Sequence, residues 1–184
     1  RRHPSTAGVD RSKTGANEVI EPVWLTKARA DLGQRETLGP NDSPWLRKVW
    51  ASLSGSWLLG QPWCGGAVAH WMAQAGIPYP KDYYRALAWA SWGTRLARPV
   101  LGAVVVYDRG KGQGHVGLAV GRTPEGHILT LGGNQKDQVR VDPFKPERLL
   151  AARWPTEAVA DWSWHLDSYL PLLASSGPVS TNEA

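Results

Sequence analysis

The apolar residues of this chain follow a helical period up to about residue 100 and a strand period after it. Four short runs in the second part are β-branched or alternating, and clusters of glycine, proline, asparagine and charged residues separate them. These runs are 102–108, 115–121, 127–133 and 138–142. Their length and spacing predict an antiparallel β-meander.

Helical spacing of apolar residues marks the first part, in 21–33, 43–53, 64–75 and, more weakly, 83–93. Pro22 and Pro44 stand at first-turn positions, where proline is favoured. Gly33 and Gly76 follow the last periodic residues of their helices. Helices followed by strands predict an α+β domain, in which the helix that starts at Cys64 packs on one face of the sheet.

The length of 184 residues suits one domain with flanking extensions. Residues 1–17 are polar and basic, which predicts a disordered arm or linker, and the domain is expected over 18–172 with a frayed tail at 173–184. No apolar stretch reaches the roughly 20 residues of a membrane span, so we expect a soluble monomer without an integral membrane segment. No secretory leader is found at the start of the sequence, but the sequence begins at Arg1 without a methionine, which leaves room for a removed upstream segment, so the export route is left open.

The chain carries a formal net charge of +5, which favours encounter with an anionic polymer such as nucleic acid, lipopolysaccharide or cell wall. No zinc-finger spacing, RNA-binding aromatic motif or long lysine and arginine run is found. We therefore do not expect nucleic acid as a partner.

The only cysteine, Cys64, stands in the stretch QPWCGG at the start of a predicted helix. A single cysteine excludes an internal disulfide, and no paired spacing suggests a metal site, so we expect no metal or other cofactor. A helix N-terminus stabilises negative charge and should lower the pKa of the thiol, which would make Cys64 a nucleophile. Gly65 and Gly66 would leave the sulfur approachable, and backbone N–H groups there suit an oxyanion. The alternative is that Cys64 is a small buried apolar residue.

Five histidines compete as the base for such a thiol. His70 lies six positions after Cys64 on the same helix and points elsewhere. His115 begins a strand on which its same-face neighbours are small, namely Gly117, Ala119 and Gly121. We expect that face to receive the end of the Cys64 helix, with His115 beside the thiol.

A third polar group is predicted from the hairpin that follows His115. If the turn lies at 123–126, the register pairs His115 with Asn134, whose amide could fix the tautomer of the imidazole. The alternative is that Asn134 is only a turn residue, and a single β-bulge would change the register.

The blocks PWCGGAVAHWMAQAGIP, GHVGLAVG and LGGNQKDQV, with ARADLGQRE upstream, resemble papain-like cysteine peptidases that cut bacterial peptidoglycan. The resemblance covers roughly residues 20–145 and points to the NlpC/CHAP group, in particular to phage-type lytic enzymes of the endolysin kind. It implies a papain-like fold, with Cys64 as nucleophile, His115 as general base and Asn134 as the orienting residue. It also implies a structural role for Glu36.

The implied activity is hydrolysis of an amide bond in the peptide stem of peptidoglycan, by an endopeptidase or an N-acetylmuramoyl-L-alanine amidase. Trp63, Trp92 and Tyr107 are candidates to line the cleft, and Gln61 is a candidate for the oxyanion site. Such a bacteriolytic, antimicrobial enzyme would be made in the cytoplasm, be released by phage or secreted, and act at the bacterial cell wall or periplasm. Two alternatives stay open: a non-catalytic cell-wall-binding protein that keeps the fold, and a thiol hydrolase or acyltransferase acting on another amide.

Overall fold

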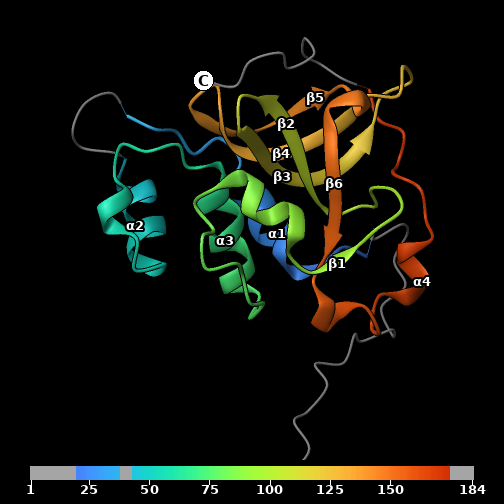
Figure 1. Ribbon diagram of the computed structural model, residues 1–184, viewed down its shortest axis with the longest axis horizontal. Helices are drawn as coiled ribbons and strands as arrows, with labels where there is room; N and C mark the ends of the chain where they lie inside the picture. Colours follow the sequence, from blue (N-terminus) through green and yellow to red (C-terminus); the bar gives the residue numbers. More distant parts are fainter. Residues whose placement is uncertain (1–19, 38–42, 175–184) are drawn as a thin grey trace, which may run out of the picture.

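The computed structural model describes residues 20–37 and 43–174 (Figure 1). The arm predicted at 1–17 and most of the predicted tail lie outside the described residues. The backbone N–H of Leu173 donates to the carbonyl of Arg122 at 2.9 Å, so hydrogen-bonded structure reaches the start of the predicted tail.

Three of the four predicted helices are confirmed as α-helices. The α-helices are α1 (Val23–Ala30), α2 (Pro44–Ser52), α3 (Cys64–Gln74) and α4 (Ser163–Leu166), and the 3₁₀ turns are η1 (Ser56–Leu58), η2 (Ala86–Ser91), η3 (Pro146–Arg148) and η4 (Thr156–Ala158). The segment predicted as a helix at 83–93 contains only the 3₁₀ helix η2, whose preceding residue Arg85 is extended and offers no side-chain cap. Among the described residues, no helix is long and apolar enough to cross a membrane.

Helix α2 shows why its residues form a helix at this point of the chain. The Ser43 hydroxyl accepts a hydrogen bond from the Leu46 backbone N–H at 3.2 Å, and Pro44 follows as the first helical residue. This cap satisfies one of the N–H groups that have no partner within the helix. Val49 and Trp50 then bury the inner face of α2 together with Leu46.

The strands form one antiparallel sheet in the order β1-β6-β2-β3-β4-β5. They are β1 (Thr94–Arg95), β2 (Val104–Gly110), β3 (Gln113–Arg122), β4 (Ile128–Gln135), β5 (Gln138–Phe144) and β6 (Leu149–Trp154). The predicted meander is confirmed as β2 to β5. The sequence did not predict β6, which pairs with β2 on the side away from β3.

The helices and the strands form two layers with the main core between them, so the predicted α+β class is confirmed. Figure 1 shows α1, α2 and α3 together beside the sheet. Val116 and Leu118 of β3 lie in the same buried cluster as Ala67 and Val68 of α3. The opposite face of the sheet carries a smaller cluster that includes Tyr107, Ala119 and Phe144. The candidate site lies where α3 begins, next to the start of β3 and the end of β4.

Candidate active site

Cys64 is the first residue of α3, as predicted, and no side chain caps this helix. The two glycines that follow it allow close packing of α3. A Cβ atom at Gly65 would collide with the backbone carbonyl of Tyr83, and one at Gly66 would lie 2.6 Å from the Trp50 ring. The N-terminus of α3 therefore packs closely against its neighbours, and the side chain of its N-cap residue, Trp63, makes no hydrogen bond to the helix.

The electrostatic setting of Cys64 differs from the prediction. Only 6% of the residue is exposed, and burial raises the pKa of the thiol above its usual value. The backbone N–H of Val116, the charge of Arg109 and the backbone N–H of Gly65 each favour the thiolate, but together they do not offset the loss of hydration. The expectation of a lowered pKa was wrong because the helix terminus is buried.

His115 lies on β3 and is almost completely buried. Its ring stacks on Phe144, with centroids 5.3 Å apart and planes 8° from parallel, and its register partner on β2 is Tyr107. The side chain therefore lies on the sheet face of Tyr107 and Ala119, not on the face that α3 covers. The prediction placed it on the helix-facing side, which strand alternation assigns instead to Val116.

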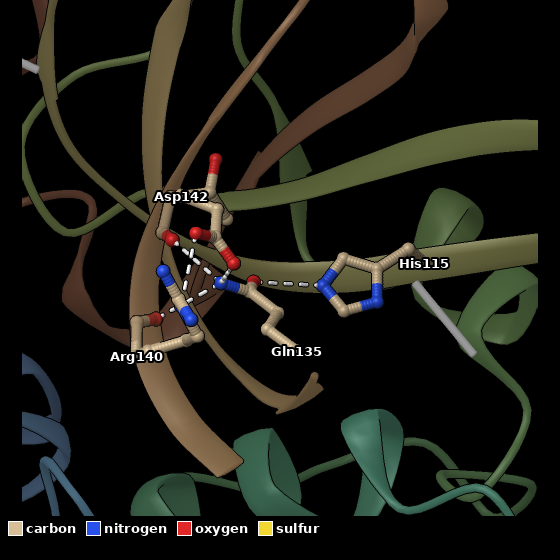
Figure 2. Close-up of polar contacts among 5 residues, drawn as sticks. His115, Gln135, Arg140 and Asp142 are labelled. Carbon is tan, nitrogen blue, oxygen red and sulfur yellow. Dashed lines mark hydrogen bonds and ion pairs between the residues drawn. The ribbon is translucent and has the colours of Figure 1, made fainter. Parts of the chain in front are cut away.

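The amide that meets the imidazole belongs to Gln135 rather than to Asn134. His115 Nε2 and Gln135 Oε1 are 2.9 Å apart (Figure 2). The predicted register holds at Leu118 and Leu131, but farther along β4 the pairing with β5 shifts between Gly132 and Gln135. Asn134, inside this irregularity, has a left-handed φ of 56°. The kink breaks the strand alternation and carries the next side chain onto the imidazole.

Three acceptors hold the Gln135 amide in one orientation. Its Nε2 donates to the carbonyls of Thr130 at 3.2 Å and Arg140 at 2.9 Å, and to Asp142 Oδ2 at 3.3 Å. The other oxygen of Asp142 lies 2.9 Å from Arg140 Nε, in the network drawn in Figure 2. If the amide were flipped, its oxygen would point at these three acceptor oxygens, and no hydrogen bond could form. Oε1 is therefore the acceptor, and His115 carries its proton on Nε2 and leaves Nδ1 as a base.

Burial also dominates the titration of His115 and lowers its pKa to about 3. The Gln135 hydrogen bond acts in the opposite direction, whereas the charges of Arg109 and Arg148 lower the pKa further. Near neutral pH the site without substrate thus holds a neutral imidazole and a protonated thiol.

Cys64, His115 and Asn134 line one cavity of about 850 Å³. The same cavity is lined by residues from the η2 region, such as Leu87, and by residues of the turn before His115. The three residues predicted as catalytic thus share one space, although the orienting contact is made by Gln135. A second cavity of about 310 Å³ also has Tyr84 in its lining.

Two of the predicted substrate-binding residues are buried supports of the site and do not line this cavity. Trp63 is fully buried, and its Nε1 donates to Glu36 Oε2 at 2.8 Å, in line with the structural role expected of Glu36. Tyr107 is also fully buried, and its hydroxyl lies 2.7 Å from Thr130 Oγ1. The prediction that both rings line the cleft was wrong, because the sequence does not reveal which large aromatic side chains are buried.

The other two predicted substrate-binding residues are more exposed. Trp92 packs against Trp89, and its Nε1 donates to the Pro78 carbonyl at 3.1 Å; it does not line the cavity of Cys64. Gln61 is exposed and lines the second cavity, not the first. The structure gives it no contact with the thiol that would suit an oxyanion site.

Two of the three remaining described histidines have side-chain partners elsewhere. His70 lies between Ser52 Oγ at 3.0 Å and Gln74 Nε2 at 2.8 Å, and His165 Nε2 lies 2.8 Å from the Leu101 carbonyl. Neither lines the cavity of Cys64. In residues 20–37 and 43–174, no group of three or more His, Cys, Asp or Glu side chains is placed to hold a metal ion.

Sequence reasoning missed Gln135 and the arginines of the cavity. Gln135 directly follows Asn134, and the preceding pair of glycines was a signal that this strand could be irregular. Arg109 stands in a cluster interpreted as a turn, and Arg148 in a segment for which no strand or site was predicted.

No protein-family model, no curated protein and no solved structure matches this chain.

Proposed function

We propose that the protein is a thiol-dependent hydrolase that cleaves an amide bond in the peptide stem of bacterial peptidoglycan. The observation that carries this proposal is the shared cavity of Cys64 and His115, with the imidazole held by Gln135. A nucleophile, a base and a group that orients the base are the three parts that acyl transfer requires.

The neutral pair suits a general-base mechanism for the first half of the reaction. Nδ1 of His115 would take the thiol proton as the sulfur attacks the substrate carbonyl, so that the raised pKa of the thiol is overcome only when substrate is bound. The tetrahedral oxyanion would be stabilised by the uncapped backbone N–H groups at the start of α3. The same imidazole would then protonate the departing amine and leave an acyl-enzyme.

The second half returns the enzyme to its starting state. A water molecule that enters after the amine leaves would give its proton to His115 Nδ1 and attack the thioester. Collapse of the second tetrahedral intermediate releases the carboxylic acid, and the proton returns to the sulfur of Cys64. The Gln135 contact would keep the ring in one tautomer through both halves.

The choice of substrate rests on the resemblance of three sequence blocks, around Cys64, His115 and Asn134, to NlpC/CHAP-type enzymes. The net charge of +5 agrees with action on the anionic cell wall. We propose a bacteriolytic, phage-type role at the bacterial wall, as an endopeptidase or as an N-acetylmuramoyl-L-alanine amidase.

The direct test is the substitution Cys64→Ser. A hydroxyl is a much weaker nucleophile beside a base arranged for a thiol, so we expect loss of wall lysis with the fold retained. Loss of turbidity of outer-membrane-permeabilised cells measures lysis, and mass spectrometry of the released muropeptides identifies the bond that is cut. The control is His127→Gln, because His127 does not line the cavity. Unchanged lysis by Cys64→Ser would refute the thiol mechanism.

Inhibitors separate this proposal from its rivals. We expect a thiol alkylator to abolish lysis and EDTA to leave it unchanged, whereas the reverse pattern would indicate a metal enzyme. A wall-binding protein without activity would bind sacculi and release no fragments. A hydrolase or acyltransferase for another amide would leave the sacculi intact.

A further inference from the structure

The cavity beside the thiol carries an excess of positive charge. Three arginines, Arg85, Arg109 and Arg148, and one carboxylate, Asp82, are among the residues that line it. A partly enclosed cavity with an excess of one sign of charge raises the local concentration of oppositely charged ligands.

Two of these arginines come from neighbouring segments: both line the cavity of Cys64 and His115, and Arg148 is hydrogen-bonded to the residue that precedes Arg109. Arg109 belongs to β2, and Arg148 ends the short helix η3, with its Nε 3.4 Å from the Asp108 carbonyl. The charges of both act on His115, and that of Arg109 also acts on Cys64. An anion bound by these arginines within the cavity would therefore lie near Cys64 and His115, where the scissile bond is proposed to lie.

We propose that Arg109 and Arg148 form a carboxylate-binding subsite, which selects peptide stems with a free carboxylate next to the scissile amide. This inference rests on the proposed function. The planar guanidinium group presents paired N–H donors that match the two oxygens of a carboxylate. Gly112 lines the same cavity, and nothing lies within 4 Å of the position that a Cβ would take there, so this part of the cavity wall is open.

The competing account is that the two arginines only adjust the titration of the catalytic pair. Under that account, removal of one charge changes turnover of every substrate by the same factor. A carboxylate contact instead affects only the substrates that carry the carboxylate, so a comparison of two substrates separates the accounts.

The experiment uses soluble muropeptides from one preparation, either untreated or with their carboxylates converted to amides by carbodiimide and ammonium. We expect the wild-type protein to cleave the untreated muropeptides with a kcat/KM at least about tenfold higher, the usual scale of a charge-assisted hydrogen bond. Arg148→Gln should lower kcat/KM about tenfold for the untreated muropeptides and less than about threefold for the amidated ones. Arg148→Lys should keep part of the preference.

The matched control is Arg95→Gln, which removes the same charge from an exposed arginine of β1 outside the cavity. It should keep the full preference for free carboxylates. Arg109→Gln provides a second variant if Arg148→Gln does not fold, as judged by circular dichroism. An equal loss on both substrates, or a wild-type protein without preference, would overturn the carboxylate subsite.

A binding measurement separates this inference from the proposed function. Titration of the Cys64→Ala protein with the two muropeptide preparations, followed by calorimetry, should give a Kd about tenfold weaker for the amidated form. If the wild-type protein cleaves neither preparation, the proposed hydrolysis fails, while equal Kd values would refute the subsite even in an active enzyme.

Discussion

At the scale of single residues, Gln135 links the imidazole to an ion pair between the buried Asp142 and the half-buried Arg140. Its Oε1 meets His115 at 2.9 Å, and its Nε2 reaches Asp142, which in turn pairs with Arg140. The charged pair thereby fixes the direction of a neutral amide, and the amide fixes which ring nitrogen is protonated. In the proposed reaction Gln135 would act only through His115, as a positioning residue.

Gln135→Ala should lower kcat by about one to two orders of magnitude, because the imidazole would lose its fixed position and tautomer. His115→Ala, which removes the proton-transferring group itself, should cost about 10³-fold or more. Asn134→Gly should cost less than either, since glycine accepts the left-handed backbone and the imidazole contact stays. Muropeptide release by purified variants of verified fold measures all three, and a larger loss for Asn134→Gly than for Gln135→Ala would return the orienting role to Asn134.

At the scale of elements, the site depends on how closely α3 lies against β4. Gly133 of β4 faces Trp63 and Ala67, at the start of α3, and Trp63 is tied by its Nε1 to Glu36. The glycine thus lets α3 approach the strand whose last residue is Gln135. The Cys64 end of the helix and the Gln135 end of the strand are held together by this contact.

Gly133→Ala should destabilise the fold by about 1 to 3 kcal/mol, the usual cost of an overpacked core. The added Cβ would lie 2.6 Å from the Trp63 ring and 2.7 Å from the Ala67 Cβ, so α3 has to move. Urea unfolding followed by tryptophan fluorescence measures the free energy of unfolding. An unchanged free energy of unfolding together with unchanged activity would contradict the prediction, because it would mean that α3 can move away from β4 without loss of stability or function.

At the scale of the whole molecule, the buried groups of the site set how stability depends on pH. The pKa of His115 is lowered to about 3, and burial also lowers that of His70. Below about pH 6.5 the unfolded chain binds protons that the folded chain does not, so stability falls as the pH falls. The buried thiol of Cys64 acts in the other direction, because above about pH 9 only the unfolded chain releases its proton readily.

We therefore expect the free energy of unfolding to be highest between about pH 6.5 and pH 9. On the acid side it should fall by up to about 1.4 kcal/mol per pH unit for each such histidine, with the contribution of His115 extending down to about pH 3. Urea unfolding at pH 7, 6 and 5 measures the slope. His115→Gln should make it shallower. Equal slopes in wild type and His115→Gln would contradict a neutral buried imidazole.

The sequence alone determined the parts of this protein that depend on neighbours along the chain. The spacing of apolar residues and the end signals such as Pro44 and Gly76 predicted the three main helices and the meander. The start of α3 at Cys64 and the position of His115 on a strand were predicted from the same local patterns. These features follow from the helix and strand periods, which can be recognised within about ten consecutive residues.

Only the tertiary structure decided which side chains meet and in which charge state. The kink at Asn134 transferred the imidazole contact to Gln135, because its left-handed backbone breaks the strand alternation just before the last residue of β4. Burial reversed the expected direction of the Cys64 pKa, because desolvation sums over every group packed around the sulfur. Arg148 reached the cavity from a segment 84 residues beyond the cysteine, and no local pattern encodes an approach over that distance.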